Sequence, residues 1–391
     1  MVADSPAAAH IPNSGATVAD QTVRNAVANV AALRPWQSVV EDLGKQVLAL
    51  SWDVVPSLAN TNDECRQVLG DSTEWSRAQA CELGWSGFGS AAIPPTSLPS
   101  LDGPGHRRIR KVINAALAAN ESFFPAEQLN TLVRNTLAHA HASQQPSDLV
   151  ANIVKPLAME HLARILGTDV RRLDQVSEHL ALTFSYAPCD NESWITAAWQ
   201  LAEVAMELLD YTDTQGPSCA AIIATADLTR REKVEALMTL LTAGFETVSG
   251  QLAIILLAVL AQPILAKLAA DEASVATVVR HLVAGIPVAG LLFPRAKQCP
   301  VESRTRAVKV PDVGSAAREH RIVTAAPERY GLAFGFGEHH CPGKGIALNF
   351  LHTATKSLAT ELARYSFTLV EFRWSTGRST HYPSHILVES R

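Results

Sequence analysis

Apolar residues recur at helical spacing over most of the chain between about residues 106 and 285. Segments such as "DLVANIVKPLAMEHLARILG" repeat them every three or four positions, which is typical of amphipathic helices. The longest such segment runs from about 229 to 262, where Pro263 is expected to end it. Its second half, "LAIILLAVLA", is apolar on every side but shorter than the ~20 residues that span a bilayer. We therefore expect a helix that is buried at the centre of the molecule.

The spacing changes after residue 305. "RTRAVKVPDV", "REHRIVTAA", "SFTLVEFRW" and "SHILVES" are short, rich in β-branched and aromatic residues, and typical of strands. Between them, "GIALNFLHTATKSLATELARY" has the spacing of an amphipathic helix. The pattern predicts a mainly α fold with a minor β portion at the C-terminal side.

Two segments lack either periodicity. Residues 1–20 are rich in Ala, Ser and Pro and are expected to be a disordered tail; they contain no basic start followed by an apolar core, so no signal peptide is predicted. Residues 83–105 are dense in Gly, Pro and Ser and predict a long loop. Trp85 and Phe88 within it favour a lid over an apolar site.

Charge and cysteine content narrow the functional classes. The net charge of −5 gives no broad basic field for nucleic acid or an anionic membrane. The six cysteines are scattered without a CxxC pair, which favours free thiols in a reducing compartment. We expect a soluble, cytoplasmic protein that binds neither nucleic acid nor membrane.

One cysteine has an unusual setting, "LAFGFGEHHCPGKGIALNF" at residues 332–350. Glycines around Cys341 allow close approach to a bulky group, and the N–H groups of the loop and of the following helix would stabilise a thiolate. Such a thiolate is a metal ligand or a nucleophile. A zinc site from His339, His340 and Cys341 is disfavoured, because three consecutive residues do not surround one tetrahedral ion. A nucleophile would need a base that the sequence does not identify.

Two further stretches carry unexpected polar groups. In "AGFETVS", residues 243–249, an acid and a hydroxyl interrupt the apolar central helix, where they are costly to bury without a function. Ala243 and Thr247 share one face, and Gly244 leaves room for a ligand. In "LDGPGHRRIRK", His106 and Arg110 are four positions apart and point the same way on a helix.

These stretches together resemble the cytochrome P450 family. "FGFGEHHCPG" is similar to its haem-binding loop, Phe-x-x-Gly-x-His/Arg-x-Cys-x-Gly. The resemblance implies a cytochrome P450-like fold, a single domain over residues 21–391, and haem b with Cys341 as the thiolate ligand of the iron. The haem would lie against the loop residues Phe334, Gly335, His339 and Gly343.

The resemblance also implies roles for the other stretches. "AGFET" is similar to the family's Ala-Gly-x-Asp/Glu-Thr signature over the haem, with Ala243 and Gly244 against the cofactor. Thr247 would then hydrogen-bond dioxygen and Glu246 would relay protons. The haem propionates would be bound by the basic residues His106, Arg110, Arg295 and His339.

One family feature is missing. The family carries Glu-x-x-Arg in a helix between the two main motifs, and its best counterpart here is "TVVR", with Thr277 in place of the Glu and Arg280 in place of the Arg. Arg329 is a candidate for the arginine that joins this pair. We expect a locally different support under the haem, since loss of the Glu would remove the partner of Arg280.

The resemblance favours a haem-thiolate monooxygenase that oxidises a small organic molecule, free or bound to a carrier protein, as a tailoring step in secondary-metabolite biosynthesis. Electrons would come from a separate ferredoxin or flavodoxin. Two alternatives stay open. One is a haem enzyme of atypical reaction: coupling, rearrangement or peroxide-driven oxidation. The other is a non-catalytic helper of a partner enzyme, which the missing Glu favours and the retained Cys341 opposes.

Overall fold

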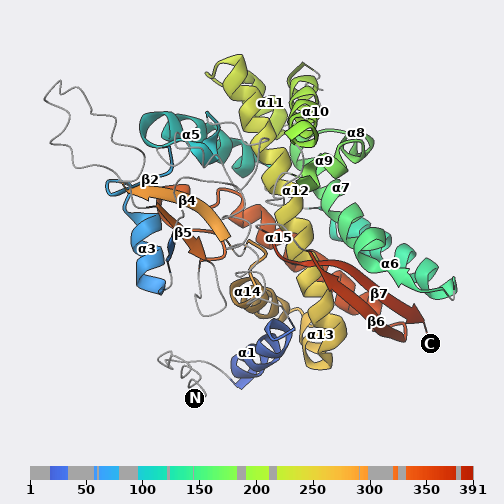
Figure 1. Cartoon of the computed structure of the whole chain (residues 1–391). Helices are drawn as coiled ribbons and strands as arrows, with labels where there is room; N and C mark the ends of the chain where they lie inside the picture. Colours follow the sequence, from blue (N-terminus) through green and yellow to red (C-terminus); the bar gives the residue numbers. More distant parts are fainter. Residues whose placement is uncertain are drawn as a thin grey trace, which may run out of the picture.

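The structure is a computed structural model of the 391-residue chain (Figure 1). The following residues are described: 18–33, 57–59, 61–78, 96–120, 124–143, 145–182, 191–210, 218–289, 291–297, 320–324, 332–375 and 380–390.

The central element is the helix α12, Arg230–Ala261, which crosses the middle of the molecule in Figure 1. It begins with a capping box, in which Thr229 and Glu232 bond each other's backbone N–H groups. It is the one helix of the described residues that is long and apolar enough to cross a membrane, with a mean hydropathy of 1.8, but 78% of that window is buried inside the protein. Neighbouring helices therefore cover its apolar sides, as a core helix requires.

Helices pack around α12 on several sides. α10, α7, α15, α13 and α11 contact it along its length, and α5 crosses it near the site described below (Figure 1). The main helices around it are α5 (Gly103–Ala119), α6 (Ala126–Ala142), α7 (Lys155–Leu166), α10 (Asn191–Asp210), α11 (Cys219–Thr225), α13 (Pro263–Ala270), α14 (Val275–Gly285) and α15 (Lys344–Leu362). The peripheral ones are α1 (Val18–Ala31), α3 (Asn62–Gly70), α8 (Val170–Asp174) and α9 (Ser177–Leu182), with a π-helical turn at Val150–Val154 and a 3-10 turn at Leu98–Ser100.

Two small sheets flank the helices on opposite sides in Figure 1. The first has the order β1-β5-β4-β2, with β1 (Ser57–Ala59) parallel to β5 (His320–Thr324), and β4 (Leu291–Lys297) antiparallel to β5 and to β2 (Trp75–Ser76). The second has the order β3-β7-β6, from β3 (Ser147–Asp148), β7 (Pro383–Ser390) and β6 (Phe367–Trp374), all antiparallel. Outside the strands, Thr380 forms an isolated bridge with Ala289, which brings the segment before β7 beside α12.

The mainly α fold with a minor β portion is confirmed. The strands expected in "REHRIVTAA" and in the C-terminal pair form as β5, β6 and β7, and Pro263 separates α12 from α13. The first helix begins at Val18, inside the segment expected to be a tail. The strand expected at "RTRAVKVPDV", the body of the lid and Arg329 lie outside the described residues.

The helix that carries "TVVR" is α14. Arg280 is exposed and donates to the hydroxyl of Thr277 at 3.2 Å. Its neighbour His281 is buried, and its Nε2 bonds the Oδ1 of Asp20 on α1 at 2.6 Å. This bond fastens α1 to α14 beside the position at which the resemblance implies an incomplete Glu–Arg pair.

Candidate active site

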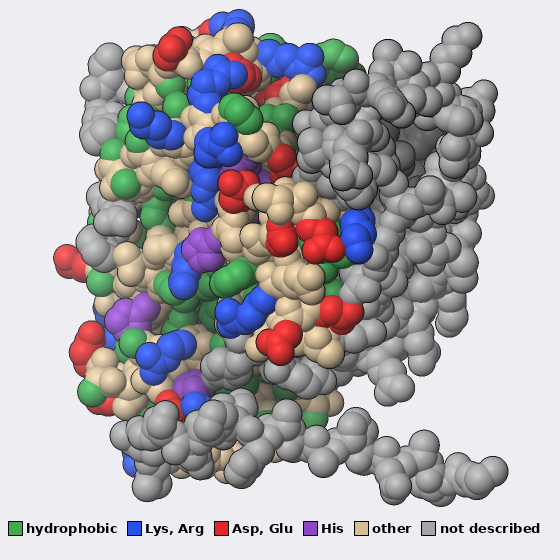
Figure 2. All heavy atoms as spheres, turned by 90° about the vertical axis from the view of Figure 1, so that its left-hand side faces the viewer, with side chains coloured by type: hydrophobic (Ala, Val, Ile, Leu, Met, Phe, Trp, Pro, Cys, Tyr) green, Lys and Arg blue, Asp and Glu red, His purple; other side chains and the backbone are tan. Residues whose placement is uncertain are grey.

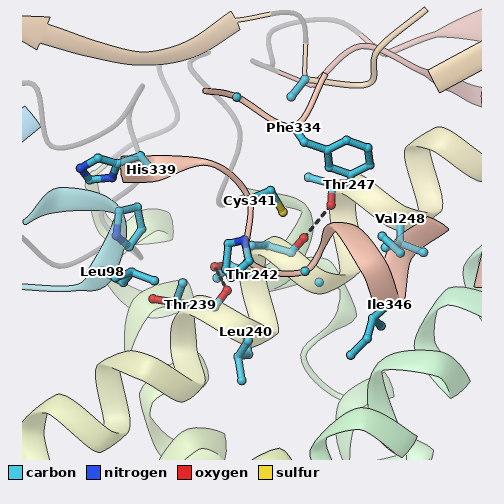
Figure 3. A pocket seen from close by; sticks show the side chains of 18 of the residues that line it. Leu98, Thr239, Leu240, Thr242, Thr247, Val248, Phe334, His339, Cys341 and Ile346 are labelled. Atoms are coloured by element: carbon cyan, nitrogen blue, oxygen red, sulfur yellow. Dashed lines mark hydrogen bonds between the residues drawn. The ribbon is translucent and has the colours of Figure 1, made fainter. Parts of the chain in front are cut away.

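A cavity of about 320 Å³ lies between α5, α12, α15 and the loop before α15. It brings together residues from several distant stretches of sequence, and Figure 3 shows Cys341 and Phe334 of the loop, Thr247 of α12 and Ile346 of α15 around it. Of the site residues predicted from the sequence, all but Glu246 line it: His106, Arg110, Ala243, Gly244, Thr247, Arg295, Phe334, Gly335, His339, Cys341 and Gly343.

The loop that carries Cys341 is held in shape by glycines. Gly335 and Gly337 have φ values of 71° and 72°, in the left-handed region that side chains disfavour. A Cβ on Gly337 would lie 2.3 Å from the carbonyl oxygen of Leu69, so the loop packs directly on the end of α3. The loop then closes on itself, because the N–H of Cys341 donates to the carbonyl of Phe334 at 2.8 Å.

Cys341 sits at the start of α15 with its thiol in two opposing environments. Burial raises its pKa above the ordinary value, whereas the N–H groups of Gly343 and Lys344 and the charge of Arg110 act to lower the pKa. A metal cation at the sulfur would reverse the balance, since a coordinated thiol is deprotonated. Phe334 and Phe336 of the loop both line the cavity, and Phe336 is also 37% exposed and packs under Arg66.

The α12 face of the cavity is built from small residues. Ala243 is exposed although it lies in the middle of a core helix, because it faces the cavity. The hydroxyl of Thr247 donates to the carbonyl of Ala243 at 2.6 Å, drawn as a dashed line in Figure 3. Gly244 has a second role that the sequence did not indicate: a Cβ there would lie 2.9 Å from Leu162, so the glycine also lets α7 approach α12.

A basic group forms the opposite wall. His106 and Arg110 of α5, Arg295 of β4 and His339 of the loop all line the cavity, and the rings of His106 and His339 lie 4.2 Å apart. Arg110 also donates to the backbone carbonyl of His340. Burial and the charge of Arg110 lower the pKa of His106, and burial lowers that of His339 to about 4. Both histidines are therefore neutral near pH 7.

The carboxylate of Asp102 lies within this basic group. It accepts from Nε2 of His339 at 3.0 Å, from the hydroxyl of Ser76 at 2.7 Å and from the N–H of Ala78 at 2.8 Å, and it lies 3.8 Å from Arg295. Burial acts to raise its pKa, but these bonds outweigh burial and hold the pKa below the ordinary range. Asp102 was not predicted, although "LDGPGHRR" places an acid one turn before His106.

The residues present fit a haem group. His106 is 1% exposed, and among the described residues neither of its ring nitrogens has a hydrogen-bond partner, which is costly unless an acidic ligand supplies one. Haem propionates are such ligands, and the guanidinium groups of Arg110 and Arg295 suit the same carboxylates. On the other side, the thiol of Cys341 offers a soft ligand for iron. No cluster of three or more His, Cys, Asp or Glu suited to another metal occurs among the described residues.

Glu246 is placed differently from the rest of its motif. It is 1% exposed, does not line the cavity, and turns toward the segment before β7. Its Oε1 accepts from the hydroxyl of Tyr382 at 2.8 Å and from that of Thr380 at 3.3 Å. The sequence placed Glu246 beside Thr247 but gave no sign of these partners, which lie more than a hundred residues later in the chain.

A buried histidine on α7 was also missed. His161 lines the cavity and stacks on Phe350 of α15, with ring centroids 4.1 Å apart. Burial, and secondarily the charge of Arg164, lowers its pKa to about 3, so it is neutral. It occupies an apolar-spaced position of α7, which in sequence is typical of an ordinary core residue.

Known proteins with similar sequences were found, although no family model matches the chain. It is 29% identical over 325 residues to nocardicin C N-oxygenase of Nocardia uniformis subsp. tsuyamanensis, covering 78% of this chain and 81% of that one. It is 25% identical over 314 residues to mycinamicin IV hydroxylase/epoxidase of Micromonospora griseorubida, covering 74% and 79%. A crystal structure of cytochrome P450mel 107F1 with biaryl coupling reactivity matches with a TM-score of 0.69 at 21% identity, covering 85% and 89%.

In sequence and fold the chain is similar to bacterial cytochrome P450 oxygenases and hydroxylases. This similarity implies an oxidoreductase with a haem cofactor.

Proposed function

We propose that the protein is a monooxygenase that oxidises a small organic molecule in a tailoring step of secondary-metabolite biosynthesis. One observation supports this most: the thiol of Cys341, the hydroxyl of Thr247 and the ring of His106 all line one cavity. The ring nitrogens of His106 have no hydrogen-bond partner among the described residues. Two relatives named above, an N-oxygenase and a hydroxylase/epoxidase, act in the same broad manner.

The chain's own residues would divide the work as follows. Cys341 would ligate haem iron, which when bound supplies the activation of dioxygen. His106, Arg110 and Arg295 would hold the propionates, and His339 would be fixed beside them by Asp102. Gly335, Gly343, Phe334, Ala243 and Gly244 would let the macrocycle approach the backbone closely.

Thr247 would act on the oxygen side of the cavity. Its hydroxyl donates to the carbonyl of Ala243, which leaves its oxygen lone pairs toward the cavity as acceptors. It would therefore orient a protonated oxygen group or a water there, and Glu246 would supply protons from the buried side of α12. The apolar surroundings, with Val248 and Leu240 beside Thr247, would exclude bulk water.

Electrons would come from a separate ferredoxin or flavodoxin. Exposed basic residues on α5, Arg107, Arg108 and Lys111, offer a docking site for an acidic partner close to the basic wall. Figure 2 shows the face on which α5 lies, with Lys and Arg gathered toward its top among scattered acids. We further propose that the protein works in the cytoplasm, on a substrate that is either free or bound to a carrier protein.

The first test is the carbon monoxide difference spectrum of the reduced protein. We expect a red-shifted Soret band of thiolate-ligated haem, and its loss in Cys341→Ala with haem still retained through the propionate wall. Cys219→Ala is the matched control, since Cys219 is a buried thiol on α11 remote from the cavity, and it should keep the band. Absence of the band in the parent protein would refute the proposal.

An oxidative coupling of aromatic rings is the second candidate. It is favoured by the structural likeness to a cytochrome P450 with biaryl coupling reactivity. Turnover of a substrate under isotopically labelled dioxygen separates the two, because incorporation of labelled oxygen into product marks a monooxygenase and coupling incorporates none.

A further inference from the structure

The buried carboxylate of Glu246 joins α12 to the segment before β7. It belongs to α12, but its bonds are to Thr380 and Tyr382 of the segment before β7. This segment is fixed in turn: the N–H of His381 donates to the carbonyl of Val288, and the hydroxyl of Ser375 donates to the carbonyl of Thr380, at 2.8 and 3.2 Å. Thr380 and Tyr382 therefore have little freedom to leave the carboxylate.

The two partners differ in what they face. Thr380 is 0% exposed to bulk solvent, yet it lines the cavity together with Thr247. Tyr382 does not line the cavity; its ring packs on Gly250, where a Cβ would lie 2.7 Å from the ring. Thr380 thus connects Glu246 to the cavity wall, and Tyr382 bonds the carboxylate from a position outside the cavity lining.

We propose that Thr380 carries protons between Glu246 and the cavity, and that Tyr382 is a positioning residue for Glu246. This inference rests on the proposed function, because it names the route by which that reaction receives protons. In the step, the protonated carboxyl of Glu246 gives its proton to the oxygen of Thr380, and the hydroxyl of Thr380 gives its own proton to an oxygen acceptor in the cavity, such as a water molecule. The carboxylate that remains accepts from Tyr382 and is reprotonated by a hydronium ion from solvent, so one proton enters for each proton delivered and no electrons move.

The geometry favours this route over direct delivery from Glu246 to Thr247. The two side chains are adjacent on a helix, so they leave it in directions about 100° apart, and only Thr247 faces the cavity. The hydroxyl of Thr247 is also engaged as a donor to Ala243 at 2.6 Å. Thr380, in contrast, bonds the acid through its hydroxyl and is one of the residues that line the cavity.

The test measures oxygen consumption without substrate, with NADPH, a reductase and excess ferredoxin, in H2O and in D2O. Glu246→Gln and Thr380→Val should each slow consumption by about a hundredfold or more, the lower end of a general acid–base contribution, and should increase the solvent isotope effect. Thr380→Ser keeps the hydroxyl and should restore both values. Thr242→Val is the matched control, because among the described residues the hydroxyl of Thr242 bonds the helix carbonyls of Met238 and Thr239 and no acid.

A second measurement does not depend on turnover. If Glu246 and Thr380 are bonded, the Tm losses of Glu246→Gln and Thr380→Val should not add in the double variant. Additive losses would overturn the proposal, as would a Thr380→Val protein with the oxygen consumption and isotope effect of the parent. Should Thr380→Val fail to bind haem, Thr380→Ala takes its place.

The failure of this inference can be told from failure of the proposed function. The rate of carbon monoxide complex formation reports electron supply and thiolate ligation before any proton is needed. If the parent protein does not form that complex, the proposed function is refuted. If the parent forms the complex and the variants match the parent in oxygen consumption, only the Thr380 route is refuted. A purely structural role for Thr380 would lower Tm and leave the isotope effect unchanged.

Discussion

At the residue scale, the buried polar groups of the site are of two kinds: those that have hydrogen-bond partners within the fold, and those whose partners a ligand would supply. Asp102 is saturated by His339, Ser76 and the backbone of Ala78, so it organises the basic wall and offers little to a ligand. Within the described part of the chain, His106 has no hydrogen-bond partner at either nitrogen, so a group bound in the cavity would supply one. The distinction follows from the cost of burying an unpaired polar atom, about 1–3 kcal/mol.

His161 gives a prediction on acid stability. Because its pKa is lowered to about 3 in the folded protein, it stays neutral there while the unfolded chain takes up a proton below its ordinary pKa of 6.5. Stability is therefore present above pH 6.5 and is lost as the pH falls toward 3. His161→Phe, which keeps the stacking on Phe350, should remove this loss and gain up to about 2 kcal/mol over the parent at pH 5 relative to pH 7.5.

Urea unfolding at the two pH values measures this difference. His139→Phe, which replaces an exposed histidine on α6, is the control and should show no such gain. An equal pH dependence in the parent and in His161→Phe would show that the burial of His161 does not carry the acid sensitivity.

At the element scale, the periodic helices and the cysteine loop could be predicted from sequence, and the contacts between elements could not. The apolar spacing of α12 and α15 reports their own buried faces, and the glycines around Cys341 report a local backbone shape. In contrast, the bond from Tyr382 to Glu246 joins two elements far apart in sequence. Nothing in "GRSTHYP" marks one of its hydroxyls as the partner of an acid on another helix.

The same limit applies at α14. The resemblance located the family's Glu-x-x-Arg position at Thr277 and Arg280 and implied that Arg280 lacks its usual partner, but it did not indicate which residues would take the place of that pair. The structure exposes Arg280 and buries His281 against Asp20. The helix was predicted, but its rotation about its own axis depends on α1, whose contribution the sequence pattern does not reveal.

The contact between the cysteine loop and α3 gives a prediction. Gly337→Ala would place a methyl group 2.3 Å from the carbonyl of Leu69 and force a left-handed backbone on alanine. We expect a loss of more than about 2 kcal/mol in stability and a marked fall in haem content, since Cys341 follows in the same loop. The ratio of Soret to protein absorbance after purification measures it.

Gly105→Ala is the matched control for this change. A Cβ at Gly105 of α5 meets only Leu101, at 3.8 Å, and alanine favours a helix over glycine. This variant should keep its haem and be slightly more stable. Full haem content in Gly337→Ala would contradict the steric argument.

At the scale of the whole molecule, the cavity stands at the junction of α5, α12, α15 and the first sheet. A group bound there would touch elements from both ends of the chain, so it would act as part of the core. Around the cavity, Ala243 is exposed, and the ring nitrogens of His106 have no hydrogen-bond partner among the described residues. Both features are expected of a core that a ligand completes.

Removal of haem should therefore weaken the entire fold. A ligand that binds only the native state adds RT ln(1 + [L]/Kd), about 4 kcal/mol when its free concentration is a thousand times Kd. We expect the haem-free protein to unfold at a clearly lower temperature and to recover on titration with hemin. Differential scanning calorimetry of both forms checks this, and an unchanged Tm would mean that the cavity contributes nothing to global stability.

The bonds between Glu246 and the segment before β7 also constrain how this chain can be recombined with its relatives. Exchange of C-terminal segments is an obvious way to alter substrate choice, since that segment forms part of the cavity wall. A graft that replaces Tyr382 and Thr380 but retains α12 would remove these two hydrogen-bond donors from the buried carboxyl group of Glu246. Chimeras should therefore transfer positions 246, 380 and 382 as one unit, and across homologous genes these three codons should change together.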